Sequence, residues 1–255
     1  MMHFLESVFK WLFVLSLLGM LITYIQKDKF PEPGFYNLSL LKEPVQSPTR
    51  KQSFETEVNE QKYTINPLFN YELQGVVVSY NDSDSLGDIT HHRRWQDFIN
   101  VRDLCVVWGE NIKNGVYLDM DFTNDSWTCW AYWPDSETHS KFSMNQLSNN
   151  HLLAHDYELK KQLMSANIGD HIRMKGVLAS YSNPGNGFQR GTSTIRTDTG
   201  NGACETIYLQ EFEILNKANK RSRRLYSVTK WLTLFSLLGF IILFAISPVR
   251  KPILK

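Results

Sequence analysis

The sequence predicts a mainly β soluble domain with one helix, flanked by two transmembrane α-helices. Two observations lead to this fold class. The 255-residue chain has an uncharged apolar segment near each end, and the region between shows the alternation of apolar and polar residues typical of strands. In addition, "KWLFVLSLLG" (10–19) and "KWLTLFSLLG" (230–239) are identical at seven of ten positions, so the two ends carry near copies of one segment.

The apolar segments are expected to cross a membrane at 11–26 and 231–248, which leaves short tails at 1–10 and 249–255. Each segment approaches the roughly 20 residues that span a hydrocarbon core. Each also begins beside a Lys-Trp pair, which suits the membrane interface. Two buried helices of a soluble protein, or a cleaved signal peptide at the first segment, are the alternatives.

Small residues recur in the twin segments as Ser16-x-x-Gly19 and Ser236-x-x-Gly239. Because small residues let helices approach closely in lipid, these two helices could form a hairpin, or each could pair with other membrane helices. A shared Leu-rich composition is the competing explanation for the likeness.

Basic residues are more numerous on the domain side of the segments, where 217–230 is a basic juxtamembrane stretch, than on the side of the termini. That count alone would keep the domain in the cytoplasm. Long domains, however, cross membranes largely regardless of charge, and the acid-free tail with Arg250, Lys251 and Lys255 favours termini held inside. We therefore expect a two-pass protein of the plasma (inner) membrane with a periplasmic or extracellular domain. A cytoplasmic domain stays open.

Residues 27–52 are expected to form a linker and 53–216 the β domain. The segments 53–58 and 62–66 flank a polar tip and predict a hairpin. Further strands are expected at 71–80, 101–109, 116–123, 127–133, 170–180 and 204–215.

The last of these strands loses its alternation between Leu209 and Phe212, which predicts a bulge. One helix is expected at 154–167, with Asp156 as its N-cap and Gly169 as its stop.

The order of these elements resembles the OB fold, a five-stranded, partly open Greek-key barrel, here with its helix between the third and fourth strands. The five strands would be 71–80, 116–123, 127–133, 170–180 and 204–215. Gly75 and Gly176 lie where sharply coiled strands need a glycine. The resemblance is topological, covers residues 71–215 and includes no diagnostic motif. Another small β-sandwich or barrel is the alternative.

The net charge and the number of cysteines limit the classes of function and the disulfide pattern that the sequence supports. A formal net charge of +1 gives no general case for nucleic-acid binding. The three cysteines are an odd number, so they do not form a fully paired framework. An exported domain would allow one disulfide among Cys105, Cys129 and Cys204, whereas three buried thiols are the alternative.

The segment "RGTSTIRTDTGNGACE" (190–205) is the main candidate binding loop, because it combines glycines and hydroxyls with Arg190, Arg196 and Asp198. Such a segment could cradle an anion or a sugar. It could equally be a hairpin loop whose polar side chains bond its own backbone.

A second candidate is "LSNNHLLA" (147–154), where Asn150 and His151 lie between leucines and form either a structural network or the floor of a ligand groove. His151 and His155 have the spacing of metal ligands on a helix, but no third ligand is indicated, so neither a metal nor a cofactor is expected. The segment His91–Arg94 is read as a solvated loop. The tryptophans of the domain form either packed core or a stacking platform for bases or sugars.

These observations favour a two-pass membrane protein that tethers a binding or scaffolding domain at the membrane surface within a bacterial envelope complex. The expected partners are the lipid bilayer and a membrane or envelope protein, and nucleic acid is disfavoured. An enzyme with Cys204 as nucleophile and His151 as base is one alternative, although a binding protein is favoured over an enzyme. A nucleic-acid-binding or oligosaccharide-binding OB-like module is another.

Overall fold

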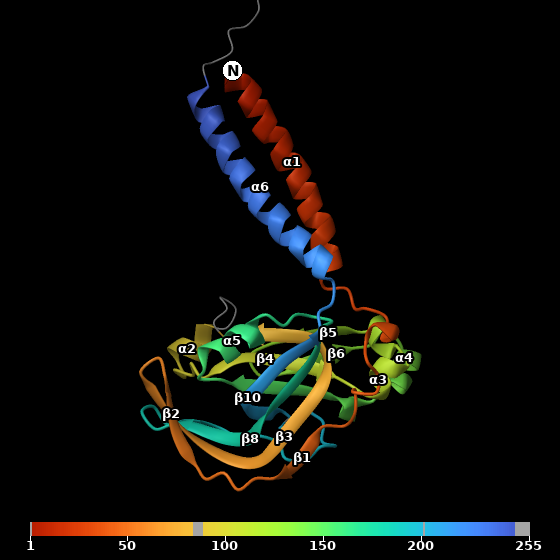
Figure 1. Cartoon of the computed structure of the whole chain (residues 1–255), viewed down its shortest axis with the longest axis vertical. Coiled ribbons are helices and arrows are strands. Elements are labelled where there is room, and N and C mark those ends of the chain that lie inside the picture. Colours follow the sequence, from red (N-terminus) through yellow and green to blue (C-terminus); the bar gives the residue numbers. More distant parts are fainter. Residues whose placement is uncertain (1, 84–88, 201, 248–255) are drawn as a thin grey trace, which may run out of the picture. The chain divides into compact units, whose positions relative to one another are not determined.

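The computed structural model describes residues 2–83, 89–200 and 202–247, and the chain divides into two units (Figure 1). One unit contains Met1–Lys29 together with Asn219–Lys255, and the other is Phe30–Ala218. The tail expected at 249–255, with its three basic residues, lies outside the described residues.

The first unit consists of two helices, α1 (Met2–Lys27) and α6 (Lys220–Ile246), which are long and apolar enough to cross a membrane. They lie side by side, and Thr233 Oγ1 donates a hydrogen bond to Ser16 Oγ at 3.0 Å between them (Figure 1). Ser16 and Ser236 are both buried in this pair. The pairing of the twin segments with each other is therefore confirmed. Most of the expected basic segment 217–230 belongs to α6 itself.

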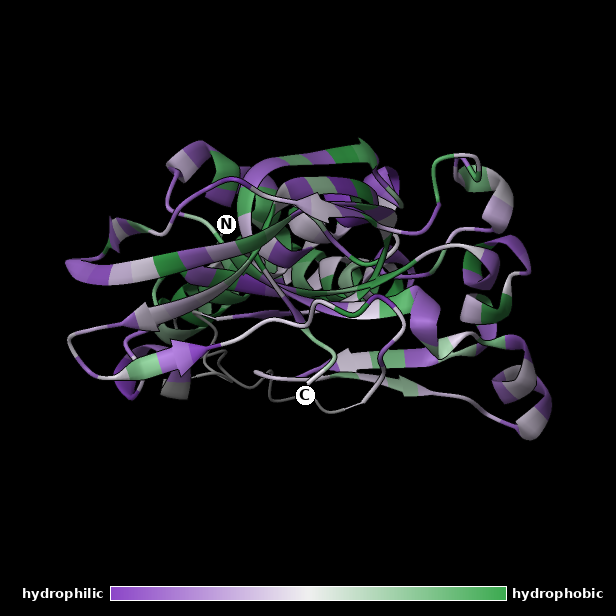
Figure 2. Cartoon of the chain, turned by 90° about the horizontal axis from the view of Figure 1, so that it is seen from below, coloured by the Kyte–Doolittle hydropathy of each residue, from purple (hydrophilic) through white to green (hydrophobic). Residues whose placement is uncertain are grey.

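The second unit is rich in strands. Its strands are β1 (Val45–Pro48), β2 (Phe54–Val58), β3 (Gln61–Asp82), β4 (Asn100–Val107), β5 (Asp121–Asn124), β6 (Cys129–Tyr132), β7 (Leu147–Leu153), β8 (His171–Asn183), β9 (Phe188–Arg190) and β10 (Glu205–Asn216). Its helices are η1 (Pro33–Phe35), α2 (Ile89–Arg93), α3 (Glu110–Lys113), η3 (Val116–Asp119), α4 (Ser136–Lys141), η4 (Met144–Gln146) and α5 (Tyr157–Met164). Hydrophilic and hydrophobic residues alternate along several strands (Figure 2).

Eight of the described strands form one sheet, in which β3, β4, β7, β10 and β8 are successive neighbours. The long strand β3 is bent (Figure 1), so its first part pairs with β8 and its last part with β4. The β7–β10 pair is parallel and the other pairs are antiparallel. The sheet is not a closed barrel. Strands β5 and β6 form a separate two-stranded sheet.

Two of the five strands assigned to the OB-like order are wrong. Segment 116–123 contains η3 before the short β5, because Gly115 adopts a positive φ of 78° that interrupts an extended chain. Segment 127–133 contributes only β6, which pairs with β5 outside the main sheet. The place beside β3 is taken by β4, which the sequence does predict, and the place beside β4 is taken by β7, which it does not.

Other sequence predictions are confirmed. Strands β2 and β3 form the expected hairpin, and its turn residues Asn59 and Glu60 have positive φ. The register of β10 against β8 shifts between Leu209 and Glu211, where a bulge is predicted. Helix α5 begins at its predicted cap, since Asp156 Oδ1 accepts a hydrogen bond from the Leu159 backbone at 2.8 Å. It ends at Met164, five residues before the predicted stop.

Residues 27–52, expected as a linker, contain η1 and β1 and pack against the domain. Tyr36 and Leu41 are buried, and Tyr36 donates its hydroxyl hydrogen to the Gly169 carbonyl at 3.0 Å. A disulfide joins Cys105 of β4 to Cys129 of β6. It therefore ties the separate β5–β6 hairpin to the main sheet.

Candidate functional site

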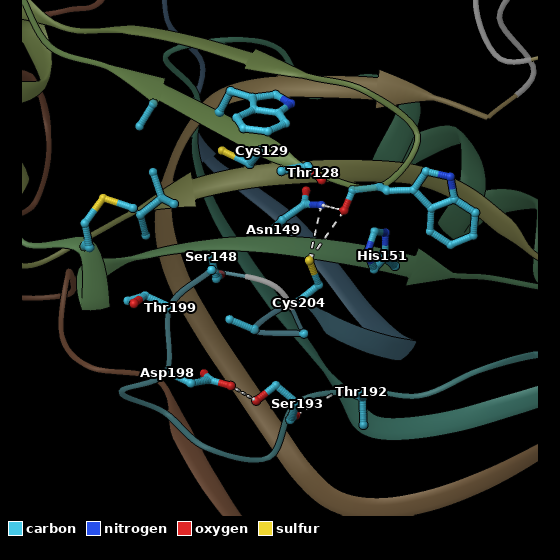
Figure 3. A pocket seen from close by; sticks show the side chains of 18 of the residues that line it. Thr128, Cys129, Ser148, Asn149, His151, Thr192, Ser193, Asp198, Thr199 and Cys204 are labelled. Atoms are coloured by element: carbon cyan, nitrogen blue, oxygen red, sulfur yellow. Dashed lines mark hydrogen bonds between the residues drawn. The ribbon is translucent and has the colours of Figure 1, made fainter.

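A cavity of about 730 Å³ lies over β7, between the β5–β6 hairpin and the loop that precedes β10 (Figure 3). The hairpin side supplies Trp127, Thr128, Cys129, Trp130, Ala131 and Trp133. The β7 side supplies Met144, Leu147, Ser148, Asn149 and His151. Strand β9 supplies Arg190, and the loop supplies Gly191, Thr192, Ser193, Asp198, Thr199, Gly200, Gly202, Ala203 and Cys204. The two sequence segments singled out as binding candidates thus meet at one site.

The hairpin wall is aromatic and accessible. Trp127, Trp130 and Trp133 are 40%, 48% and 41% exposed, so these rings are not core residues. Trp127 packs edge-to-face on Trp95 with ring centroids 4.5 Å apart, and Trp130 Nε1 donates to Asp125 Oδ2 at 3.0 Å. These contacts hold the rings in place while part of each surface stays open.

The opposite wall is polar and mostly uncharged. Asn149 Nδ2 donates to the Trp127 carbonyl at 3.1 Å, and Asn149 Oδ1 accepts from Asn124 Nδ2 at 2.8 Å. In the loop, Ser193 donates its hydroxyl hydrogen to Asp198 Oδ2 at 2.6 Å (Figure 3). This wall is therefore shaped by hydrogen bonds from β7 and from within the loop.

Arg190 joins the two walls. Its Nη2 donates to His151 Nε2 at 2.8 Å, and its guanidinium carbon lies 4.1 Å from the centre of the Trp127 ring. His151 Nδ1 lies 2.7 Å from Asp103 Oδ1. Burial lowers the pKa of His151 and outweighs the opposing effect of Asp103. A neutral His151 with its proton on Nδ1 faces Asp103 and leaves Nε2 free to accept from Arg190.

Behind His151, buried polar residues continue into the domain. Asn100 Nδ2 donates to Asp103 Oδ1 at 3.1 Å, and His91 Nε2 lies 3.0 Å from Asp97 Oδ2. Tyr181 donates its hydroxyl hydrogen to the same Asp97 oxygen at 2.5 Å. The reading of His91–Arg94 as a solvated loop is wrong at His91, which is fully buried. Asn100 and Asp103 are both on β4, whereas Tyr181 reaches Asp97 from β8, so no single spacing in the sequence indicates the whole network.

The remaining predicted binding residues do not join the cavity. Arg196 turns away and pairs with Glu205, with its guanidinium over the Tyr71 ring. Burial raises the pKa of Glu205 to about 7, against the opposing effect of Arg196. Asn150 projects from the other face of β7, where its Nδ2 donates to the Leu104 carbonyl at 3.1 Å.

The geometry argues against Cys204 and His151 as a nucleophile and base. Both nitrogens of His151 face other groups, Asp103 and Arg190. Burial also raises the pKa of the Cys204 thiol, which lowers the fraction of reactive thiolate. The thiol instead lies 3.5 Å from the Trp127 carbonyl and accepts from Asn149 Nδ2 at 3.8 Å.

No protein-family model, curated protein or solved structure matches this chain. The functional argument therefore depends on the chemistry of the cavity. Within the described ranges, no group of three His, Cys, Asp or Glu side chains could hold a metal ion. The two histidines with helical spacing do not share a helix, because His151 is on β7 while His155 Nδ1 lies 2.7 Å from the Tyr208 hydroxyl.

Proposed function

We propose that this chain is a two-pass membrane protein that holds a ligand-binding β domain at the surface of a bacterial inner membrane, as part of an envelope complex. The cavity beneath the β5–β6 hairpin is the observation that carries this proposal. It combines accessible tryptophans with hydrogen-bonding groups, which is the composition of ligand sites in proteins.

The membrane assignment is supported by the faces of α1 and α6 that do not contact each other. Apolar side chains cover these faces, and Leu15 and Phe235 are both 65% exposed. A core helix of a soluble protein would bury such residues, whereas lipid accommodates them. The polar contact between Ser16 and Thr233 is of the kind that holds helices together in a bilayer.

The exported side is supported by the disulfide between Cys105 and Cys129, since disulfides persist in oxidising compartments such as the periplasm. We therefore place the domain on the periplasmic or extracellular face. This location also suits a partner that is itself held in the envelope.

An OB-like relationship is also part of the proposal. The neighbour order β3, β4, β7, β10 and β8, with α5 between β7 and β8, supports it. OB folds bind ligands with the loop between their fourth and fifth strands. Here that loop joins β8 to β10 and lines the cavity.

Cys204 provides the test, because it is the free cysteine of the chain and lines the cavity. In intact cells, a small membrane-impermeant methanethiosulfonate should label the full-length protein but not Cys204→Ser. With purified protein in nanodiscs, an extract of the native cell envelope should slow this labelling at least tenfold. Labelling only after cell lysis would contradict export, and an extract that leaves the labelling rate unchanged would contradict an occupied cavity.

A further inference from the structure

We propose that the cavity binds a short, uncharged saccharide, a proposal that rests on the ligand-binding function above. Three features of the lining lead to this class of ligand: open aromatic rings, many neutral hydrogen-bonding groups, and few charged groups.

The aromatic rings suit the apolar faces of sugars. A pyranose ring has a face of C–H groups that packs on an aromatic surface, and tryptophan offers the largest such surface together with an N–H donor. Trp127 and Trp130 line the cavity and keep 40% and 48% of their surfaces exposed. The contacts of Trp127 with Trp95 and Arg190 restrain its ring, which lowers the entropic cost of stacking a ligand on it.

The facing wall suits hydroxyl groups. It presents the side chains of Thr128, Ser148, Thr192, Ser193 and Thr199. Hydroxyls both donate and accept hydrogen bonds, as do those of a sugar. Three of these hydroxyls already have partners in the protein, since Ser148 accepts from Asn150, Thr192 accepts from the Thr206 backbone and Ser193 donates to Asp198. A sugar hydroxyl can use the hydrogen-bonding capacity that remains on this wall, which an alkyl chain cannot.

The charged residues of the lining argue against an anionic ligand. Arg190 donates to His151 through Nη2 and covers Trp127, while its buried Nη1 has no hydrogen-bond partner among the described residues. This single donor, opposed by the Asp198 carboxylate in the same lining, suits a neutral hydroxyl better than an anion. Asp198 accepts from Ser193. A nucleic acid requires several basic residues along its phosphates, but Arg190 is the single Lys or Arg among the described lining residues.

The size of the cavity sets the length of the ligand. Its volume of about 730 Å³ falls within the range of about 300–1,000 Å³ that is typical of small-molecule sites. The cavity therefore accommodates a few sugar units, which are either a free oligosaccharide or one end of a longer glycan.

Protection of Cys204 from the methanethiosulfonate distinguishes these ligands. One set of probes is maltotriose, cellotriose and chitotriose, each added to the full-length protein in nanodiscs. The other probe is the native envelope extract, tested before and after mild periodate oxidation. Periodate cleaves the vicinal diols of sugars. We expect at least one trisaccharide to protect Cys204, or periodate to abolish protection by the extract.

A matched pair of variants places the binding in the cavity. Trp130→Ala should weaken protection at least tenfold. Tyr132→Ala should leave protection unchanged, because Tyr132 is similarly exposed on β6 but does not line the cavity. An equal loss in both variants would overturn the proposed site.

The outcomes separate the two proposals. Protection by the extract that survives periodate, with no protection by any trisaccharide, overturns the saccharide but retains the binding function. Abolition of that protection by nuclease or protease would likewise overturn the saccharide. Absence of protection by both the extract and the trisaccharides overturns the binding function itself.

Discussion

The two nitrogens of His151 face different partners, Asp103 and Arg190, and the second contact depends on the first. Asp103 lies 2.7 Å from Nδ1 and favours the tautomer that is protonated there, which leaves Nε2 unprotonated and able to accept from the arginine. Arg190 in turn lies over Trp127 and so restrains one wall of the cavity. The position of one proton on His151 therefore determines how Arg190 is held against Trp127.

Asp103→Asn should disrupt this arrangement. An amide that donates to Nδ1 would place the histidine proton on Nε2, where it meets the Arg190 donor. We expect the free energy of unfolding of the domain to fall by about 1–3 kcal/mol and protection of Cys204 to weaken. Urea unfolding of the full chain in detergent measures the first effect. The control, Asp156→Asn, retains an N-cap at an exposed site and should change stability by less than about 0.5 kcal/mol.

His171 should make the domain sensitive to mild acid. Burial lowers its pKa to about 4 in the folded protein, compared with about 6.5 in the unfolded chain. Between these values the unfolded chain binds the proton more readily, so stability is full above pH 6.5 and falls as the pH decreases toward 4.

Glu205, whose pKa is raised to about 7, acts in the opposite direction over part of this range. The readout is therefore the difference between the urea midpoints of the unaltered protein and His171→Gln, which should change in favour of the variant from pH 8 to pH 4. His139→Gln removes an exposed histidine and should follow the unaltered protein. An unchanged pH profile in His171→Gln would refute the assignment.

At the level of elements, β6 and β7 show what the sequence could and could not predict. Segment 127–133 is apolar on both faces, which suggested a buried strand, but its tryptophans line a cavity. Segment 147–153 contains Asn149, Asn150 and His151, so its strand was hidden by polar residues whose buried partners come from distant elements. Alternation of apolar and polar residues reports burial, so it does not identify a strand that borders a cavity or that carries buried polar residues.

The candidate loop and "LSNNHLLA" were both found from composition. Composition could not predict that the two segments meet, because the parallel pairing of β7 with β10 joins residues more than fifty positions apart, such as His151 and Thr206. By contrast, the β2–β3 hairpin, the α5 cap and the β10 bulge depend on neighbours in the chain. Those features could therefore be predicted.

Gly176 is the position in β8 where a side chain is least tolerated. A Cβ there would lie 2.3 Å from the Tyr208 carbonyl oxygen, which is backbone and has little freedom to move. Gly176→Ala should cost about 1–3 kcal/mol of stability by overpacking. Gly34→Ala is the control, since no atom lies within 4 Å of its added Cβ. Equal urea midpoints for the two variants would contradict this prediction.

The Cys105–Cys129 disulfide should stabilise the hairpin wall. It closes a segment of 24 residues, and the loss of a crosslink of this length costs about 3 kcal/mol. Replacing both cysteines with serine should lower stability by that amount and weaken ligand protection of Cys204. Dithiothreitol should have the same effect on the unaltered protein and no further effect on the double variant. Cys204→Ser, with the disulfide intact, should keep its stability.

At the scale of the whole molecule, α1 and α6 are joined to the first and last residues of the β domain, Phe30 and Ala218. If both helices span the membrane, the amino and carboxyl ends share one side and the domain occupies the other. A fluorescent protein that folds only in the cytoplasm should therefore fluoresce when fused to either end. The same protein inserted in the exposed Asn59-Glu60 turn should stay dark. Fluorescence from the inserted protein would refute export.

If both helices span the membrane, attachment at both ends also governs how the domain can be released from it. A protease that cuts once between the helices leaves two fragments, each anchored by its own helix and held to the other by the sheet. Because β3 and β10 come from opposite halves of the chain yet both pair with β8, such a nicked domain stays in place. Shedding requires two cuts, one beside each helix.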